Sequence, residues 1–125
     1  MYSVISNVIR SLSMEHDPKA FLYDISQSCN DILDFTKQMT VDEYAKDPLI
    51  KAAVERKFLV IGEALVRLRD EFPEILKSIS DHSKIIGFRN VLVHGYDVID
   101  DITVWSAVSE GIPKLLSEVQ LIIDK

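Results

Sequence analysis

The amino-acid sequence predicts an all-α protein: a single-domain bundle of four main helices, with a short extra helix or an irregular connection over residues 74–80. Three observations lead to this prediction. Apolar residues recur at steps of three and four in several segments, and no segment alternates apolar and polar residues as a half-buried strand does. Asp-Pro pairs, a typical helix start, occur at the head of two of these segments. The chain of 125 residues, 47% hydrophobic and 27% charged, is long enough for one modest core but too short for two.

The first two main helices are predicted to begin at these Asp-Pro pairs. Asp17-Pro18 opens a helix that runs to about residue 38. Asp47-Pro48 opens the segment with the best amphipathic pattern in the chain, and Pro73 is expected to end it. The apolar stripe of the first helix consists of Leu22, Ile25, Cys29, Ile32 and Met39, and that of the second of Ile50, Val54, Phe58, Ile61, Leu65, Leu68 and Phe72.

The third and fourth main helices follow from similar signals. Asp81 can cap the third helix, which should end near Gly95, a residue able to take the left-handed conformation of a helix end. Asp100 or Asp101 begins the last helix, and Pro113 lies inside it and should kink it. The third helix carries Ile85, Phe88 and Leu92, and the last carries Val104, Val108, Ile112, Leu115, Val119 and Ile122.

Charge and cysteine content limit the classes of function. The net charge of −6 argues against a protein that binds nucleic acid through a broad basic surface, although a small cationic site for one phosphate remains compatible with it. Cys29 is the single cysteine, so an intrachain disulfide is impossible and a reducing cytoplasm is the natural setting. Residues 1–13 resemble neither a signal peptide nor a membrane span, and are interpreted as an extension or an upstream start before a domain of residues 14–125.

The stretch GFRNVLVHGYDVID places four polar residues close together at the end of the third helix. Asn90 and His94 are four apart and share a face, so the amide can orient the imidazole. Arg89 and His94 are five apart and diverge by about 140° on a straight helix. This spacing suggests either a bend within the motif or two copies of the chain that place their motifs together. Arg89 would share a face with Tyr96 if the helix continued through Gly95.

The chemistry available to this set is narrow. His82 is the only other histidine near it, and no group of Asp, Glu or Cys has metal-binding spacing, so a metal enzyme is not expected and no cofactor is predicted. A histidine that transfers protons, an arginine that binds a phosphate and an asparagine that orients them suit metal-free RNA cleavage, in which the substrate's 2′-OH is the nucleophile and a 2′,3′-cyclic phosphate remains. Spacing alone favours a plainer interpretation of the four polar residues. In it Arg89 is a surface cation and Asn90 forms a local hydrogen bond, while His94 is partly buried and Tyr96 is a packing residue.

The sequence RNVLVHGYDVID resembles the R-N-x-x-x-H-x-Y signature of HepT-type toxins of the HEPN superfamily. These are all-helical ribonucleases encoded beside an MNT-type nucleotidyltransferase antitoxin. The segments AVERKFLVIGEALVRL, FLYDI and VWSAVSEGIPKLL resemble other helices of the family, so the similarity extends over residues 14–119. The resemblance implies a HEPN-like helical bundle.

The resemblance also implies roles for single residues. Arg89 and His94 would form the ribonuclease motif, with Asn90 in support, and Tyr96 would be the tyrosine that the antitoxin modifies with AMP. The protein would be the toxin of a type VII-like toxin–antitoxin system and would act as a homodimer with both motifs in a shared cleft, which accounts for the divergence of Arg89 and His94. The acidic surface predicts salt-sensitive RNA binding confined to that cleft.

Two interpretations of Glu63 remain open from the sequence. It can pair with Arg67 one turn later on a solvated face, which is the favoured interpretation, or it faces the cleft and positions Arg89 or His94. The alternative to a toxin is a non-catalytic helical subunit that binds a nucleotidyltransferase, and a purely structural helical dimer is a third possibility. Trp105 is interpreted as core or dimer packing rather than as a platform for RNA bases.

Overall fold

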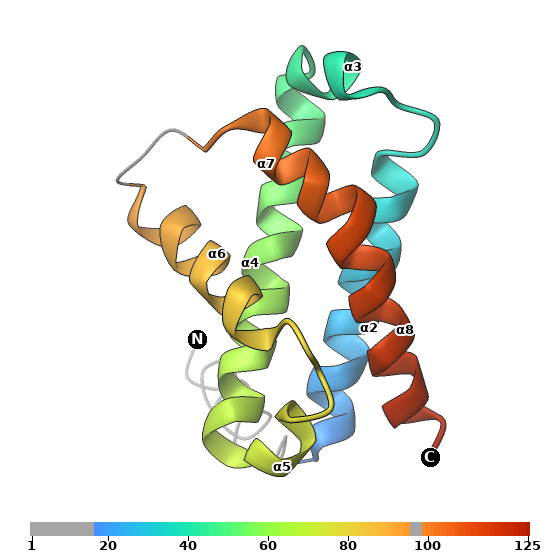
Figure 1. Cartoon of the computed structure of the whole chain (residues 1–125), viewed down its shortest axis with the longest axis vertical. Helices are drawn as coiled ribbons and strands as arrows, with labels where there is room; N and C mark the ends of the chain where they lie inside the picture. The colour runs from blue at the N-terminus through green and yellow to red at the C-terminus, as the bar shows by residue number, and fades with distance from the viewer. Residues whose placement is uncertain (1–16, 96–98) are drawn as a thin grey trace, which may run out of the picture.

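The computed structural model describes residues 17–95 and 99–125, and within these residues the protein consists of helices without a strand, so the all-α prediction is confirmed. The long helix α4 (Pro48–Glu71) runs through the middle of the bundle, with α2 (Pro18–Phe35) on one side and α6 (His82–His94) on the other (Figure 1). The other elements are α3 (Val41–Ala45), α5 (Pro73–Leu76), α7 (Asp101–Ser106), the π-helical segment η1 (Ala107–Gly111) and α8 (Ile112–Ile123).

The predicted starts of the first two main helices are confirmed. Asp17 caps α2, its Oδ1 accepting a hydrogen bond of 2.9 Å from the backbone N–H of Lys19. Asp47 caps α4 in the same way through the N–H of Ile50 at 3.0 Å. Each carboxylate thus satisfies one of the backbone donors that the first turn of a helix leaves without a partner.

The first helix ends at Phe35, earlier than predicted, so Met39 does not belong to its apolar stripe. The hydroxyl of Thr36 donates a hydrogen bond of 2.8 Å to the carbonyl of Ile32. Gln38 then has a positive φ of 63°, which an α-helix cannot contain. The spacing of the apolar residues suggested a longer helix, because it gives no sign of this change in backbone conformation.

The short helix α5 occupies part of the connection for which a short extra helix was one of two predicted forms. The other short helix, α3, was not predicted. Thr40 and Glu43 form a reciprocal capping box at its start, with hydrogen bonds of 3.2 and 2.9 Å. A helix of five residues is too short to show an amphipathic period, so only the capping residues could have indicated it.

The last helix begins after Asp100, whose side chain accepts a hydrogen bond of 3.1 Å from the N–H of Ile102. Pro113 perturbs this helix through the π-helical segment η1, which ends two residues before it, and the chain continues directly into α8. The N–H of Ile112 bonds to the carbonyl of Ala107, five residues upstream. This wider turn accommodates a residue that lacks an N–H and clashes with the carbonyl four residues before it.

The core lies along α2, which packs against α4 on one side and α8 on the other. Cys29 is completely buried there, as the sequence predicted, and its burial raises the pKa of the thiol to about 12. Trp105 packs against the buried ring of Tyr44 with centroids 5.3 Å apart, in agreement with a packing role. No helix in residues 17–95 and 99–125 is long and apolar enough to cross a membrane.

Candidate functional site

The polar motif occupies the last two turns of α6. The helix is α-helical from His82 to His94 without a break, so the bend considered from the sequence is not present. Arg89 and His94 therefore point about 140° apart on this helix. Gly95 ends it with a left-handed backbone, φ 60° and ψ 24°, and its N–H bonds to the carbonyl of Val91 at 3.0 Å. The predicted end at a left-handed glycine is confirmed.

The helical continuation that would align Arg89 with Tyr96 does not occur, because the chain leaves the helix at Gly95. Tyr96 lies outside the described residues. At the other end of α6, Asp81 occupies the cap position but makes no capping hydrogen bond, contrary to the prediction. Its carboxylate lies 3.3 Å from Lys114 of α8 instead, an ion pair that ties the start of α6 to the last helix.

Arg89 is held by two side chains. Its Nη2 donates to Oε1 of Glu63, across from α6 to α4, and its Nη1 donates to Oδ1 of the adjacent Asn90 at 2.8 Å. The side chain of Arg89 is 22% exposed and that of Glu63 is 57% exposed. The guanidinium is therefore fixed at the edge of the contact between the two helices, where solvent reaches the pair.

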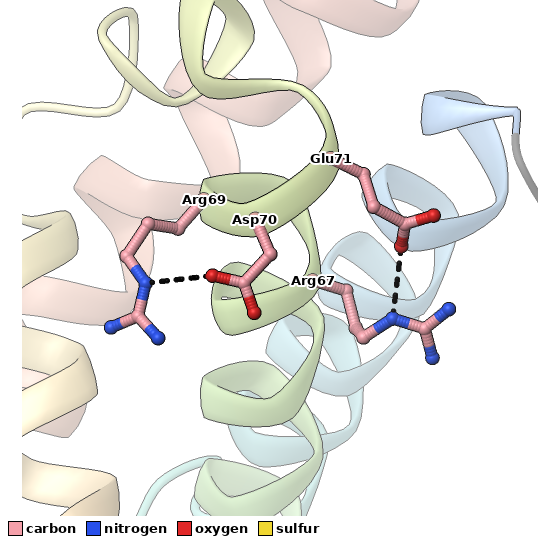
Figure 2. Close-up of polar contacts among 4 residues, drawn as sticks. All are labelled: Arg67, Arg69, Asp70 and Glu71. Carbon is pink, nitrogen blue, oxygen red and sulfur yellow. Dashed lines mark hydrogen bonds and ion pairs between the residues drawn. The ribbon is translucent and has the colours of Figure 1, made fainter.

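This geometry decides between the two interpretations of Glu63. The favoured one, a pair with Arg67 on a solvated face, is wrong: Arg67 Nε instead donates to Oε2 of Glu71 at 2.9 Å (Figure 2). The guanidinium of Arg67 also lies over the ring of Phe21, 5.1 Å from its centroid. Because Arg67 points toward the C-terminal end of α4, the carboxylate of Glu63 is left to Arg89.

Asn90 supports the site through the arginine. The sequence suggested that Asn90 orients the imidazole of His94, and that role stays a prediction, whereas the hydrogen bond to Arg89 is direct. His94 is the final residue of α6 and its side chain is exposed, in contrast to the partly buried histidine of the plainer interpretation. An exposed imidazole can reach a substrate or a second protein chain.

Sequence reasoning missed Gly62, which lies directly beneath Arg89. A β-carbon at position 62 would overlap the β- and γ-carbons of Arg89 and lie 3.3 Å from its Cδ. Gly62 is buried in the middle of a 24-residue helix, where glycine costs about 0.5–1 kcal/mol relative to alanine. An interior glycine in a strong helix was the available signal for such a close approach.

Two open grooves flank α6. One, of about 420 Å³, lies beside Glu63 and is lined by Arg56, Arg67 and Val93 among others. It places two basic side chains next to the Arg89–Glu63 pair. The other, of about 680 Å³, lies between α6 and the last helix and has an apolar wall built around Phe88. The larger groove contains none of the predicted site residues, so size does not identify the site here.

Among the described residues, no group of three or more His, Cys, Asp or Glu side chains could hold a metal ion. The polar groups at the site are thus Arg89, Asn90 and Glu63, with His94 at the end of the same helix. This set can bind and orient a phosphate through the guanidinium and move a proton through the imidazole.

Comparison with known proteins places the chain in a family. Residues 25–122 match the family model described as Ribonuclease HepT-like. The chain belongs to the HepT-like ribonuclease family. The matched HepT-like region contains α4, α6 and the last helix as far as Ile122, and with them Glu63, Arg89, Asn90 and His94. The resemblance inferred from the motif is therefore confirmed, and the family supports the prediction of an endoribonuclease.

Individual relatives agree with this assignment. "Putative RNase MJ1380" of Methanocaldococcus jannaschii is 38% identical over 108 residues, which cover 86% of this chain and 98% of that protein. "Putative RNase MJ1216" of the same organism is 37% identical over 113 residues, 87% of this chain and 89% of that protein. "Probable ribonuclease HepT" of Thermococcus cleftensis is 28% identical over 102 residues, 82% of this chain and 92% of that protein. No solved structure gives a significant match.

Proposed function

We propose that this protein is the toxin of a HEPN/MNT toxin–antitoxin pair and cleaves RNA without a metal ion. The observation that supports the proposal is the arrangement of polar side chains on α6 in a member of the HepT-like ribonuclease family. Glu63 and Asn90 hold Arg89 at the surface, and His94 is exposed on the same helix. The neighbouring groove adds the cation of Arg56 near this site, although Asp24 lines the same groove and the net charge of the chain is −6.

The proposed reaction is an attack of the RNA 2′-OH on the adjacent phosphorus. His94 accepts the proton of the 2′-OH as the new bond forms, and Arg89 stabilises the negative charge that grows on the phosphate oxygens. The bond from phosphorus to the 5′-oxygen of the next nucleotide breaks, and an imidazolium returns a proton to that oxygen. The products are a 2′,3′-cyclic phosphate and a free 5′-OH.

The site is proposed to be shared between two chains. Arg89 and His94 diverge by about 140° on one unbroken helix, so one copy does not direct both at the same phosphate. Val93, which is 50% exposed, lines the groove beside Glu63, on the same side of α6 as the Arg89–Glu63 pair. A two-fold axis on this side of α6 would place Arg89 of one chain opposite His94 of its partner.

A mixing experiment tests both the reaction and the sharing. Arg89→Ala and His94→Ala are each expected to lose about 100- to 1000-fold in cleavage of a fluorogenic RNA oligonucleotide, while wild type works in the presence of EDTA. When the two inactive variants are unfolded, mixed and refolded, about a quarter of wild-type activity should return, because half the dimers then contain one intact composite site. Retained activity in both single variants would contradict the assignment of Arg89 and His94 as the catalytic pair, whereas the absence of cleavage by wild type would favour the non-catalytic nucleotidyltransferase-binding subunit.

Regulation is proposed to occur at Tyr96. Its phenolic oxygen would attack the α-phosphorus of a nucleoside triphosphate in the MNT-type antitoxin, with pyrophosphate as the leaving group and the phenolic proton passing to a base. The added phosphate and adenosine would exclude RNA from the site by charge and volume. Intact-mass measurement after co-expression with an MNT-type nucleotidyltransferase should show one or more added AMP groups that are absent in Tyr96→Phe. Addition at another residue would contradict this assignment.

A further inference from the structure

The contact between α4 and α6 is unusually close at one point, where the backbone of Gly62 meets the stem of Arg89. One turn earlier on α4, Phe58 packs edge-on against Phe88 of α6, with ring centroids 4.9 Å apart. At this point two aromatic rings lie in the contact between the helices. At Gly62 no side chain intervenes, and the β- and γ-carbons of Arg89 occupy the volume that any other residue would fill.

The next residue of α4 completes the arrangement. Glu63 follows Gly62 directly and pairs with Nη2 of Arg89, while Nε of Arg89 is buried without a hydrogen-bond partner among the described residues. Packing on Gly62 therefore determines where the stem lies, and the polar contacts act only on the terminal nitrogens. Glu63 can hold the guanidinium at the exposed edge only because the stem lies flat on the helix beneath it.

We propose that Gly62 is a positioning residue for Arg89: the missing side chain at this point of α4 fixes the arginine at the site, and Glu63 then orients its guanidinium. This inference rests on the proposed ribonuclease function for its catalytic consequence, but not for its structural one. A methyl group at position 62 would push the stem of Arg89 off α4 and move the guanidinium away from Glu63 and Asn90 together.

The test compares Gly62→Ala with Gly111→Ala, a helical glycine around which nothing lies within 4 Å of an added β-carbon. With a fluorophore–quencher RNA oligonucleotide of mixed sequence, Gly62→Ala should lower kcat about 10- to 100-fold, because a displacement of about 1 Å is enough for such a loss. KM should change by less than about threefold, since other contacts hold the RNA. Gly111→Ala should match wild type. An unchanged kcat in Gly62→Ala overturns the inference.

A second measurement does not depend on activity. The ¹⁵N–¹H resonance of Arg89 Nε, assigned by its loss in Arg89→Lys, should shift in Gly62→Ala and stay in place in Gly111→Ala. If wild type cleaves no RNA, the proposed function fails, and this resonance alone decides the role of Gly62: an unshifted signal overturns it. Should Gly62→Ala fail to fold, addition of Arg89→Gly should restore the melting temperature to that of Arg89→Gly alone. If the melting temperature is not restored, the added methyl group overlaps with atoms other than those of Arg89, and the inference is overturned.

Discussion

Replacement of Glu63 by glutamine should lower both kcat and KM. Glutamine keeps the size of the side chain and a hydrogen-bond acceptor, but removes the charge that holds Nη2 of Arg89. A less firmly oriented guanidinium stabilises the transition state less well, so kcat should fall. The same substitution removes a negative charge that competes with the RNA phosphate for Arg89, so KM should fall as well.

The size of these effects follows from the exposure of the pair. Two unit charges about 4 Å apart attract by about 4 kcal/mol at an effective dielectric constant of about 20. Since the Glu63 side chain is 57% exposed, water screens most of this attraction, and pairs of this kind contribute about 0.2–1 kcal/mol to stability. We therefore expect Glu63→Gln to reduce the free energy of unfolding by at most about 1 kcal/mol. A tenfold fall in kcat corresponds to a rise of about 1.4 kcal/mol in the activation free energy, which would exceed the loss in the free energy of unfolding.

The matched control is Asp70→Asn on the same helix. Asp70 is 58% exposed and pairs with Arg69 at 3.2 Å, so it has the chemistry and exposure of Glu63 without contact to Arg89 (Figure 2). Steady-state cleavage of a fluorogenic RNA oligonucleotide gives kcat and KM, and urea unfolding gives stability. The reasoning is refuted if Glu63→Gln and Asp70→Asn have the same kcat, or if KM rises in Glu63→Gln.

Three further predictions concern the scaffold. Nζ of Lys57 lies 2.9 Å from Oδ2 of Asp31, and this hydrogen bond lowers the pKa of the Asp31 carboxyl below 3.8. The pair therefore stabilises the fold above this pH, and the stabilisation is lost as the pH falls through the lowered pKa. Urea unfolding of wild type and Asp31→Asn should differ by about 0.5 kcal/mol at neutral pH and converge as the pH falls through the lowered pKa, and a constant difference would contradict this. Cys29 is fully buried with its thiol pKa raised to about 12, so Ellman's reagent at pH 8 should label it only as fast as the protein unfolds; rapid labelling of folded protein would refute its burial. Leu65→Ala, at a fully buried position, should cost about 2–5 kcal/mol in urea unfolding, and a loss below about 1 kcal/mol would mean that the core is looser than described.

Much of the helical framework could be predicted because its signals are local. An aspartate before a proline accepts a hydrogen bond from a backbone N–H in the first turn of the helix that it begins. Gly95 ends a helix because glycine can adopt the left-handed backbone conformation. The predictions that failed required information from outside the local pattern. The first helix stops early because of the reversal at Gln38, and Asp81 turns to Lys114, a residue of another helix, instead of capping its own.

The sequence by itself determined that Arg89, Asn90 and His94 lie on one helix and that Arg89 and His94 diverge, because a helix has a fixed rotation per residue. It could not determine the partner of Glu63. Spacing along α4 made Arg67 the natural choice, whereas the true partner, Arg89, is 26 residues away and on another helix. Only the packing of α6 on α4 at Gly62 brings those two charges together, and such an approach depends on the shapes of both helix surfaces, which a one-dimensional period does not contain.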